Sequence, residues 1–204
     1  MSLPIDKFLY FIGWVFYRAI FKIFWRLKVS GLENIPSKGG VIIASNHLSL
    51  ADPPLIGASL PKPIFYMAKK ELFEIPIFGW ILKKVNAFPV DRNSNDLKAM
   101  KTAKKILQEG KTLLIFPQGG RRSEENLEAK NGVGILSCWA HVPVVPCCVI
   151  NSNKLKKFAR LRVCFSKPIF PPDISNKKNN KEIYREITQK VINEIRCIKE
   201  KMTQ

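Results

Sequence analysis

The feature that most constrains the fold is an alternation of short apolar runs with longer segments of helical periodicity. Five runs rich in bulky or β-branched residues are each long enough for one strand, at residues 41–45, 64–68, 112–116, 144–150 and 161–165. Apolar side chains also recur at three- and four-residue spacings within residues 97–107 and 183–202. Strands that alternate with helices indicate an α/β fold, so we predict a mixed, largely parallel sheet flanked by helices.

Polar and glycine residues predict where two of these helices begin and end. Asp52 precedes two prolines, which predicts a helix with Asp52 as its N-cap that runs to about Leu60. Ser94 or Asn95 is predicted to cap the next helix, and Gly110 to end it.

Length and charge limit the domain organisation and the partners. The 204 residues suit one domain, which we expect at residues 29–204, with residues 1–28 as a separate membrane-interface helix. The net charge of +18 requires an anionic partner, such as nucleic acid, anionic lipid or a phosphorylated substrate. Five cysteines without a C-x-x-C pair, beside only two histidines, predict reduced thiols in the cytosol and no metal site.

The N-terminal segment concentrates aromatic side chains. Residues 8–25 contain nine of the 21 aromatic residues of the chain (13 Phe, 4 Tyr and 4 Trp). On a helix, Arg18, Lys22 and Arg26 would form one basic stripe beside an apolar, aromatic face. This pattern is typical of an amphipathic helix that lies in the membrane interface with its cations on anionic lipid.

Two other interpretations of this segment stay open. It could be a core helix of a soluble domain, or it could cross the bilayer. The uncharged run from Phe8 to Tyr17 is about half of the roughly 20 residues that a spanning helix needs. A signal peptide is not predicted, because no small-residue cleavage site follows a short apolar core.

A histidine and an aspartate, His47 and Asp52, follow the first predicted strand. Histidine suits general-base chemistry near neutral pH, and a carboxylate on its other ring nitrogen would fix the tautomer and stabilise the imidazolium. The five-residue step does not put both side chains on one face of a helix, so the pair requires a turn. The pair alone is a weak signal, because a histidine that ends a strand and an aspartate that caps a helix would have the same spacing.

Four more segments accompany this pair, in a fixed order along the chain. They are residues 69–79 with Lys69, Glu71, Leu72, Pro76 and Gly79, residues 88–92 ending in Asp91 and Arg92, residues 116–123 with Phe116, Pro117, Gly119 and Arg121, and the proline-flanked strand 142–146. Together with Asn46, His47 and Asp52, they make the chain resemble the glycerolipid acyltransferase family over roughly residues 28–170. The resemblance is strongest to the 1-acylglycerol-3-phosphate (lysophosphatidic acid) acyltransferase branch.

The resemblance implies an acyl-transfer reaction. His47 would be the general base that takes the proton from the acceptor hydroxyl, and Asp52 would orient His47. The hydroxyl oxygen would attack the thioester of acyl-CoA or acyl carrier protein directly, so neither a metal nor another cofactor is expected. The acceptor would be the free hydroxyl of 1-acylglycerol 3-phosphate, and the product phosphatidic acid for phospholipid synthesis.

The resemblance also implies how the acceptor phosphate is held. Arg92 and Arg121 would bind it, because the planar guanidinium matches phosphate oxygens, and the backbone amides of Gly119 and Gly120 would face phosphate or the developing oxyanion. Four further residues are expected to support the site: Asn46, Lys69, Glu71 and Gln118.

The third segment departs from the family pattern at three positions. Gln118 stands where glutamate is usual and Gly120 where threonine is usual, and Arg122 adds a positive charge in place of serine. These changes leave three alternatives open: another acceptor such as glycerol 3-phosphate, a lysolipid that contains an amino acid, or an inactive membrane-binding relative.

The remaining expectations concern partners and location. Nucleic acid is not expected as a partner, because a binding platform would interleave aromatic with basic residues, whereas the aromatics concentrate near the N-terminus. The expected partners are a membrane surface with anionic lipid, the lysophospholipid acceptor and the thioester donor. We expect a peripheral or monotopic protein on the cytoplasmic face of the cell membrane.

Overall fold

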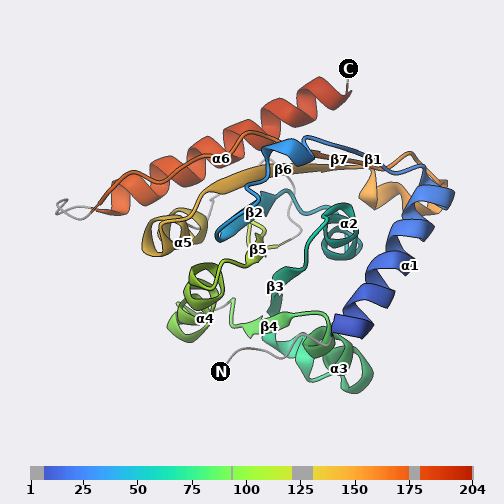
Figure 1. Cartoon of the computed structure of the whole chain (residues 1–204), viewed down its shortest axis with the longest axis horizontal. Coiled ribbons are helices and arrows are strands. Elements are labelled where there is room, and N and C mark those ends of the chain that lie inside the picture. The colour runs from blue at the N-terminus through green and yellow to red at the C-terminus, as the bar shows by residue number, and fades with distance from the viewer. Residues whose placement is uncertain (1–6, 93, 121–130, 175–179, 204) are drawn as a thin grey trace.

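The computed structural model describes residues 7–92, 94–120, 131–174 and 180–203 (Figure 1). Its helices and strands, in chain order, are α1 (Lys7–Trp25), β1 (Lys28–Ser30), η1 (Leu32–Asn34), β2 (Val41–Ser45), α2 (Asp52–Ser59), β3 (Ile64–Lys69), η2 (Lys70–Phe73), α3 (Pro76–Lys84), β4 (Ala87–Val90), α4 (Leu97–Gln108), β5 (Thr112–Ile115), α5 (Gly132–Ala140), β6 (Val144–Ile150), η3 (Ser152–Lys157), β7 (Arg162–Phe165) and α6 (Asn180–Thr203).

A seven-stranded sheet forms the middle layer, in the order β1-β7-β6-β2-β5-β3-β4. Strands β6, β2, β5, β3 and β4 all run parallel to one another. Strand β7 pairs antiparallel with β6, and β1 pairs parallel with β7. The predicted α/β fold with a mixed, largely parallel sheet flanked by helices is confirmed.

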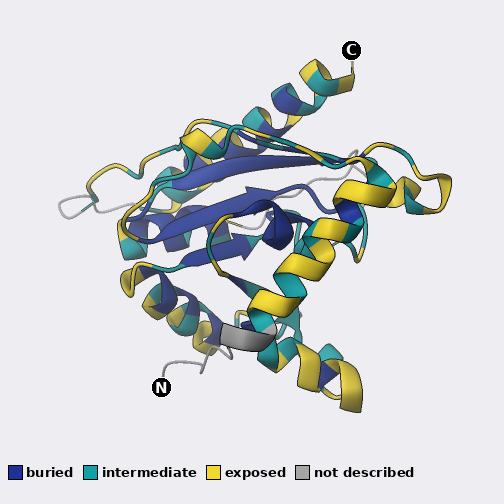
Figure 2. Cartoon of the chain, turned by 45° about the vertical axis from the view of Figure 1, so that its right-hand side comes forward, coloured by how far each residue is buried: buried dark blue, intermediate teal, exposed yellow. Residues whose placement is uncertain are grey.

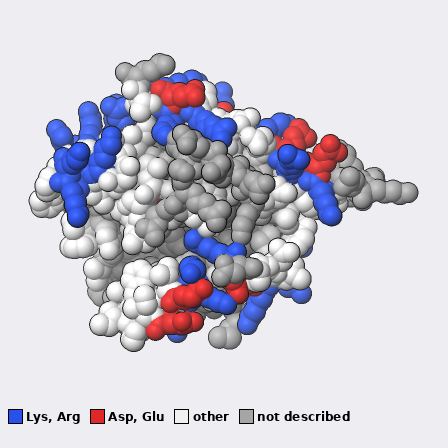
Figure 3. Space-filling model, turned by 180° about the vertical axis from the view of Figure 1, so that it is seen from behind, with Lys and Arg blue, Asp and Glu red and all other residues white. Residues whose placement is uncertain are grey.

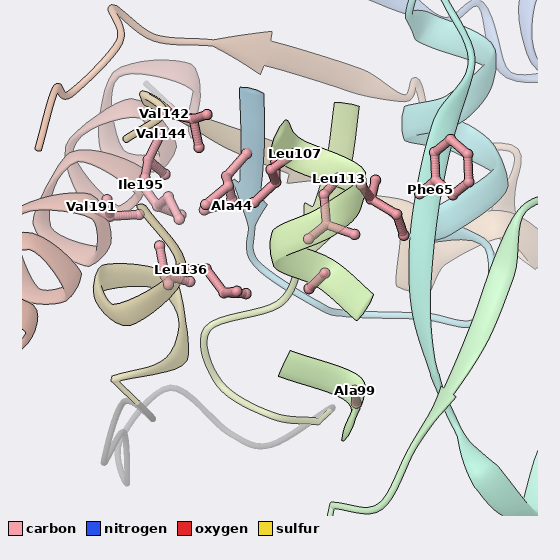
Figure 4. Packing of buried hydrophobic residues seen from close by; sticks show 14 of the residues in the cluster. Ala44, Phe65, Ala99, Leu107, Leu113, Leu136, Val142, Val144, Val191 and Ile195 are labelled. Atoms are coloured by element: carbon pink, nitrogen blue, oxygen red, sulfur yellow. The ribbon is translucent and has the colours of Figure 1, made fainter. Parts of the chain in front are cut away.

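Each face of the sheet has its own apolar core, because alternate residues of a strand point to opposite faces. Ile42 and Ala44 of β2 pack in a cluster that includes residues of α4, α5 and α6 (Figure 4). Val41 and Ile43 pack in the other cluster, which includes residues of α2 and Phe21 of α1. Since both faces are covered, the central strands are apolar throughout rather than alternating in polarity.

Helix α1 is tied to the domain by polar side chains on its inner side. The backbone N–H of Ile64 donates to the Tyr10 hydroxyl oxygen, at 3.1 Å. The Trp14 indole N–H donates to the Leu60 carbonyl at 2.8 Å. The inner side of α1 therefore belongs to the folded domain.

The predicted basic stripe of α1 is wrong. Arg18 donates to the Ala58 carbonyl, at 3.0 Å, and its guanidinium lies over the Trp14 ring, so it is on the inner side. Arg26 lies beyond the last helical residue and has a positive φ of 48°. Arg18 turns inward because the Ala58 carbonyl lies in the last turn of α2. Carbonyls in the last turn of a helix have no donor within that helix.

The outer side of α1 is apolar and exposed (Figure 2). Its exposed large apolar side chains are Phe11, Ile12, Val15, Phe16, Tyr17, Ile23 and Phe24. Of the helices that the structure describes, none combines the length and the apolar character needed to cross a bilayer.

Both predicted N-caps are wrong. Helix α2 has Ala51 as its N-cap, and Asp52 is its first residue. Helix α4 is capped by Asp96, whose carboxylate accepts from the Ala99 N–H, rather than by Ser94 or Asn95. Strand ends differ by one residue: β3 extends to Lys69, and β5 ends one residue early at Ile115.

Candidate active site

The predicted site residues that the structure describes lie at one edge of the sheet. Strands β2, β5, β3 and β4 are parallel neighbours, so their carboxyl ends meet at the same edge. His47, Gln118, Lys69 and Arg92 come from the ends of these four strands, in that order across the sheet. In open α/β sheets, ligands bind outside the carboxyl ends of the strands.

A tight turn joins His47 to Asp52. The Nδ1 atom of His47 lies 2.8 Å from Oδ2 of Asp52. The same oxygen accepts the backbone N–H groups of Leu48, at 2.6 Å, and Ser49, at 2.8 Å. Asp52 therefore fails to cap its own helix because its carboxylate turns back onto the preceding loop and the imidazole.

This contact fixes the protonation of the neutral imidazole. A carboxylate only accepts hydrogen bonds, so Nδ1 of His47 carries the proton and donates it to Asp52. The other ring nitrogen, Nε2, then has the lone pair, and the residue can act as a base through that atom. The predicted geometry, a turn rather than one helix face, is what the structure contains.

Burial strengthens this pair. The exposed fraction is 8% for His47 and 0% for Asp52. The second oxygen of Asp52, Oδ1, is buried and lacks a hydrogen-bond partner among the described residues. The ring of Phe116 stacks on the imidazole, with 4.0 Å between centroids and 16° between planes. The pair thus lies in surroundings where its electrostatic interaction is poorly screened.

The sequence predicts no role for Phe116 beyond its place among the residues that carry the family resemblance. The only signal for a role in the site is that Phe116 directly follows β5, as His47 follows the end of β2. Stacking could not be inferred without knowing that β2 and β5 are neighbours.

Asn46 joins the base to the next strand. Its side-chain amide donates to the Val149 carbonyl at 2.9 Å, and its oxygen accepts the Val149 N–H at 2.7 Å. Asn46 is buried, and its side chain continues the link between β2 and β6 beyond their last backbone pair, Ser45 with Cys147. This double bond fixes the point at which the chain leaves β2 for His47.

Gln118 holds the same turn from the other side. Its Oε1 atom accepts the backbone N–H of His47, at 3.3 Å. A carbonyl oxygen suffices for this bond, so the glutamine keeps the contact without adding a negative charge.

The glycine turn after β5 links the base to an arginine. Gly119 has a positive φ of 67°, and its N–H donates to the Phe116 carbonyl at 2.9 Å. Its carbonyl accepts Nη1 of Arg92, at 3.0 Å. A Cβ at Gly120 would lie 3.8 Å from the same Nη1 atom, which is an ordinary contact. Arg92, Gly119 and Gly120 are therefore brought together, whereas Arg121 falls outside the described residues.

Charged pairs occupy the ends of β3 and β4. Lys69 pairs with Glu71 at 3.4 Å, and Lys70 pairs with Asp91 at 2.7 Å. The hydrogen bond that Lys70 donates to the Asp91 carboxylate raises the pKa of Lys70. Hydrogen bonds from the backbone N–H groups of Asp91 and Ala99 lower the pKa of Asp96, which fixes the loop after β4. Lys69 and Glu71 thus lie at the predicted edge, where they bond to each other.

A hollow behind the base was not predicted from the sequence. It is lined by the ends of β2 and β5, through Asn46 and Gln118, and by Ile195, Arg196 and Lys199 of α6. The sequence marks α6 only as amphipathic, so its approach to the site depends on tertiary packing. Two cations of α6 therefore lie near the candidate site.

The fold and the site define an α/β protein with a buried His–Asp pair at the carboxyl edge of its sheet. The family model described as Acyltransferase matches residues 26–150, more than half of the chain, and the chain belongs to this family.

Two bacterial relatives extend the match. A 1-acyl-sn-glycerol-3-phosphate acyltransferase of Bacillus subtilis is 33% identical over 182 residues, which cover 87% of this chain and 90% of the relative. A protein of the same name from Streptococcus pneumoniae is 30% identical over 178 residues, 84% of this chain. The chain spans 66% of the length of that second relative.

A solved structure supports the fold. The 1-acyl-sn-glycerophosphate (LPA) acyltransferase PlsC from Thermotoga maritima superimposes with a TM-score of 0.72 and 24% sequence identity. The match covers 95% of this chain and 80% of that one.

Proposed function

We propose that this protein transfers a fatty acyl group from a thioester to the free hydroxyl of 1-acylglycerol 3-phosphate, forming phosphatidic acid. The observation that carries the proposal is the 2.8 Å contact between His47 Nδ1 and Asp52 Oδ2, two residues within the range that the acyltransferase family model matches. The names of the Bacillus and Streptococcus relatives support this acceptor.

The reaction follows from the tautomer of His47. Nε2 takes the proton of the acceptor hydroxyl while the hydroxyl oxygen attacks the thioester carbonyl. Asp52 stabilises the imidazolium that forms. The tetrahedral intermediate collapses with cleavage of the carbon–sulfur bond, and the imidazolium returns the proton to the departing thiolate. Because the thioester is already activated, the chain needs no other cofactor, and the donor is acyl-CoA or acyl carrier protein.

Arg92 and the glycine turn form the proposed phosphate site. The guanidinium uses Nη1 to bond the Gly119 carbonyl, which orients its planar face. The N–H of Gly119 already donates to Phe116, so of the two glycine amides Gly120 is the one proposed to face phosphate or oxyanion. Arg121 remains a proposed second phosphate ligand.

The membrane is the proposed working surface. Helix α1 would lie in the interface on its exposed apolar side, while its inner side stays packed on α2 and β3. The high positive charge supports attraction to anionic lipid. We propose a peripheral or monotopic protein on the cytoplasmic face of the cell membrane, since a lipid acceptor is delivered there.

Gln118, which stands where the family pattern has glutamate, leaves a second candidate acceptor open, glycerol 3-phosphate in place of the lysolipid. A panel of acceptors tests both, with palmitoyl-CoA or palmitoyl acyl carrier protein as donor and mass spectrometry of the lipid product. Phosphatidic acid from 1-acylglycerol 3-phosphate supports the first proposal. Product from glycerol 3-phosphate alone supports the second, and no product from any pair would contradict both.

A further inference from the structure

Helix α3 has an inverted pattern of burial. Its only buried residue is Gly79, whereas its large apolar side chains face outward. Ile77 is 78% exposed, Trp80 56% and Ile81 41%. A helix that packs in a water-soluble domain places large apolar residues inward, so the outer face of α3 requires an apolar environment of its own.

The packing of α3 on η2 fixes the outward orientation of its large apolar side chains. A Cβ at Gly79 would lie 2.3 Å from the Phe73 carbonyl oxygen in η2, a distance that no side chain tolerates. Glycine therefore lets α3 rest directly on the backbone of η2. Turning the helix to bury its large side chains would lose this contact, so the apolar face is held outward.

The end of α3 carries cations suited to a lipid surface. The Lys84 ammonium lies 5.9 Å from the centre of the Trp80 ring, and Lys83 precedes it in the last turn. No Asp or Glu occurs within Pro76–Lys84. Tryptophan with adjacent lysines is the combination found where a helix meets lipid headgroups.

We propose that α3 inserts Ile77, Trp80 and Ile81 into a phospholipid bilayer, as a second contact beside α1. Figures 1 and 2 both place α3 near the N-terminal end of α1, the helix proposed to lie in the membrane interface. This inference rests on the proposed membrane function and adds a named insertion surface to it.

Charge selects the bilayer over a second copy of this chain. A second copy would offer these lysines no acidic side chain from its own α3, so a contact of α3 with α3 would leave the cations without an opposite charge. Phospholipid headgroups provide the opposite charge around an apolar interior.

Vesicle binding tests the inference. The variant Ile77→Ser/Trp80→Ser/Ile81→Ser changes only exposed side chains, so the fold should persist, as circular dichroism will verify. We expect its partition onto phosphatidylglycerol–phosphatidylethanolamine vesicles to fall by about tenfold or more, because apolar contact with the acyl region is lost. Phe170→Ser is the control for the loss of an exposed aromatic side chain. Phe170 is 67% exposed and lies outside α3, because it follows Ile169, which pairs with the first residue of β6. The control should bind as the wild type does.

Lipids brominated along their chains give an independent readout. Bromine on the lipid chains should quench the tryptophan fluorescence of the vesicle-bound protein. The part of this quenching that comes from Trp80 should be absent in Trp80→Phe. If the triple variant bound vesicles as the wild type does, and quenching were unchanged in Trp80→Phe, the role of α3 would be overturned. Membrane binding through α1 would remain intact. Failure of the wild type to bind vesicles would contradict both. A wild-type dimer that the triple variant converts to a monomer with unchanged vesicle binding would identify the face as a contact between copies and overturn the inference.

Discussion

The two halves of the carboxyl edge of the sheet differ in how their polar groups are satisfied. At β2 and β5 the side chains of Asn46, His47 and Asp52 are buried, and each makes at least one hydrogen bond within the protein. At β3 and β4 the charges are nearer the surface, where Lys70 pairs with Asp91 (Figure 3 shows how widely such charges are spread over one face). The first half has a fixed geometry, whereas we propose that the partly exposed second half exchanges a carboxylate for a substrate anion at little cost.

The largest expected effect is in the buried half. Asp52→Asn should lower kcat by roughly 10⁴-fold with little change in KM, because an amide that donates to Nδ1 would select the wrong imidazole tautomer. Steady-state kinetics with varied acceptor measures this. A change confined to KM would mean that Asp52 acts in binding, and the two halves would then not differ as described.

Asn46→Ala tests whether the buried half is held by its hydrogen bonds. The change leaves the N–H and carbonyl of Val149 without their partner in a buried strand. The free energy of unfolding should fall by about 2–4 kcal/mol, as urea denaturation would measure. Gln189→Ala, on the exposed side of α6, is the control and should change stability by less than about 0.5 kcal/mol. If Asn46→Ala and Gln189→Ala lowered the free energy of unfolding equally, the buried hydrogen bonds would not be what holds this half of the edge.

Arg92→Lys tests the exchangeable half. Lysine keeps the charge but loses the planar fork that bonds the Gly119 carbonyl and would face phosphate. We expect KM for the phosphate-bearing acceptor to rise by about tenfold, equivalent to about 1.4 kcal/mol, with kcat nearly constant. An unchanged KM would exclude Arg92 from phosphate binding.

The smallest expected effect is at Asp96, which holds the loop after β4. Asp96→Ala should cost about 1 kcal/mol of unfolding free energy, because the N-cap of α4 is lost. The pKa of Asp96 is lowered in the folded protein, so its stabilisation is present above the ordinary carboxyl pKa and disappears as pH falls through the lower, folded value. The difference from wild type should therefore shrink below about pH 4.

Asp96→Asn is the matched variant for this pH dependence. Its amide oxygen can still accept from the Ala99 N–H, but its NH₂ cannot accept from Asp91. Thermal melts over a range of pH should show a variant of intermediate stability whose difference from wild type also shrinks in acid. A difference that grew as pH fell would contradict the assigned pKa direction.

The central strands could be predicted from the sequence because they are continuous apolar runs. Residues 41–45 and 144–150 have the predicted bounds, since strands covered on both faces need no polar alternation. Strand β4 was missed because Pro89 argues against a strand, and the structure accommodates it since β4 is an edge strand. Helix α5 was missed because it is mostly buried and contains Gly134, which lies against the Tyr184 backbone.

Part of the site could also be predicted. The His47–Asp52 pair and its turn follow from local spacing, and the ordered segments identified the strand ends that meet it. The stacking of Phe116, the bond between Asn46 and Val149, and the cations of α6 depend on which strands and helices are neighbours, which local sequence does not encode. The inner position of Arg18 was missed for the same reason, since its acceptor lies 40 residues away.

The most direct test of the central claim is thiol release from palmitoyl-CoA in the presence of 1-acylglycerol 3-phosphate, comparing wild type with His47→Ala. We expect release that depends on the acceptor in the wild type and is lost in the variant, while circular dichroism shows both to be folded. Acceptor-dependent release that persists in His47→Ala would contradict the assignment of His47 as the base.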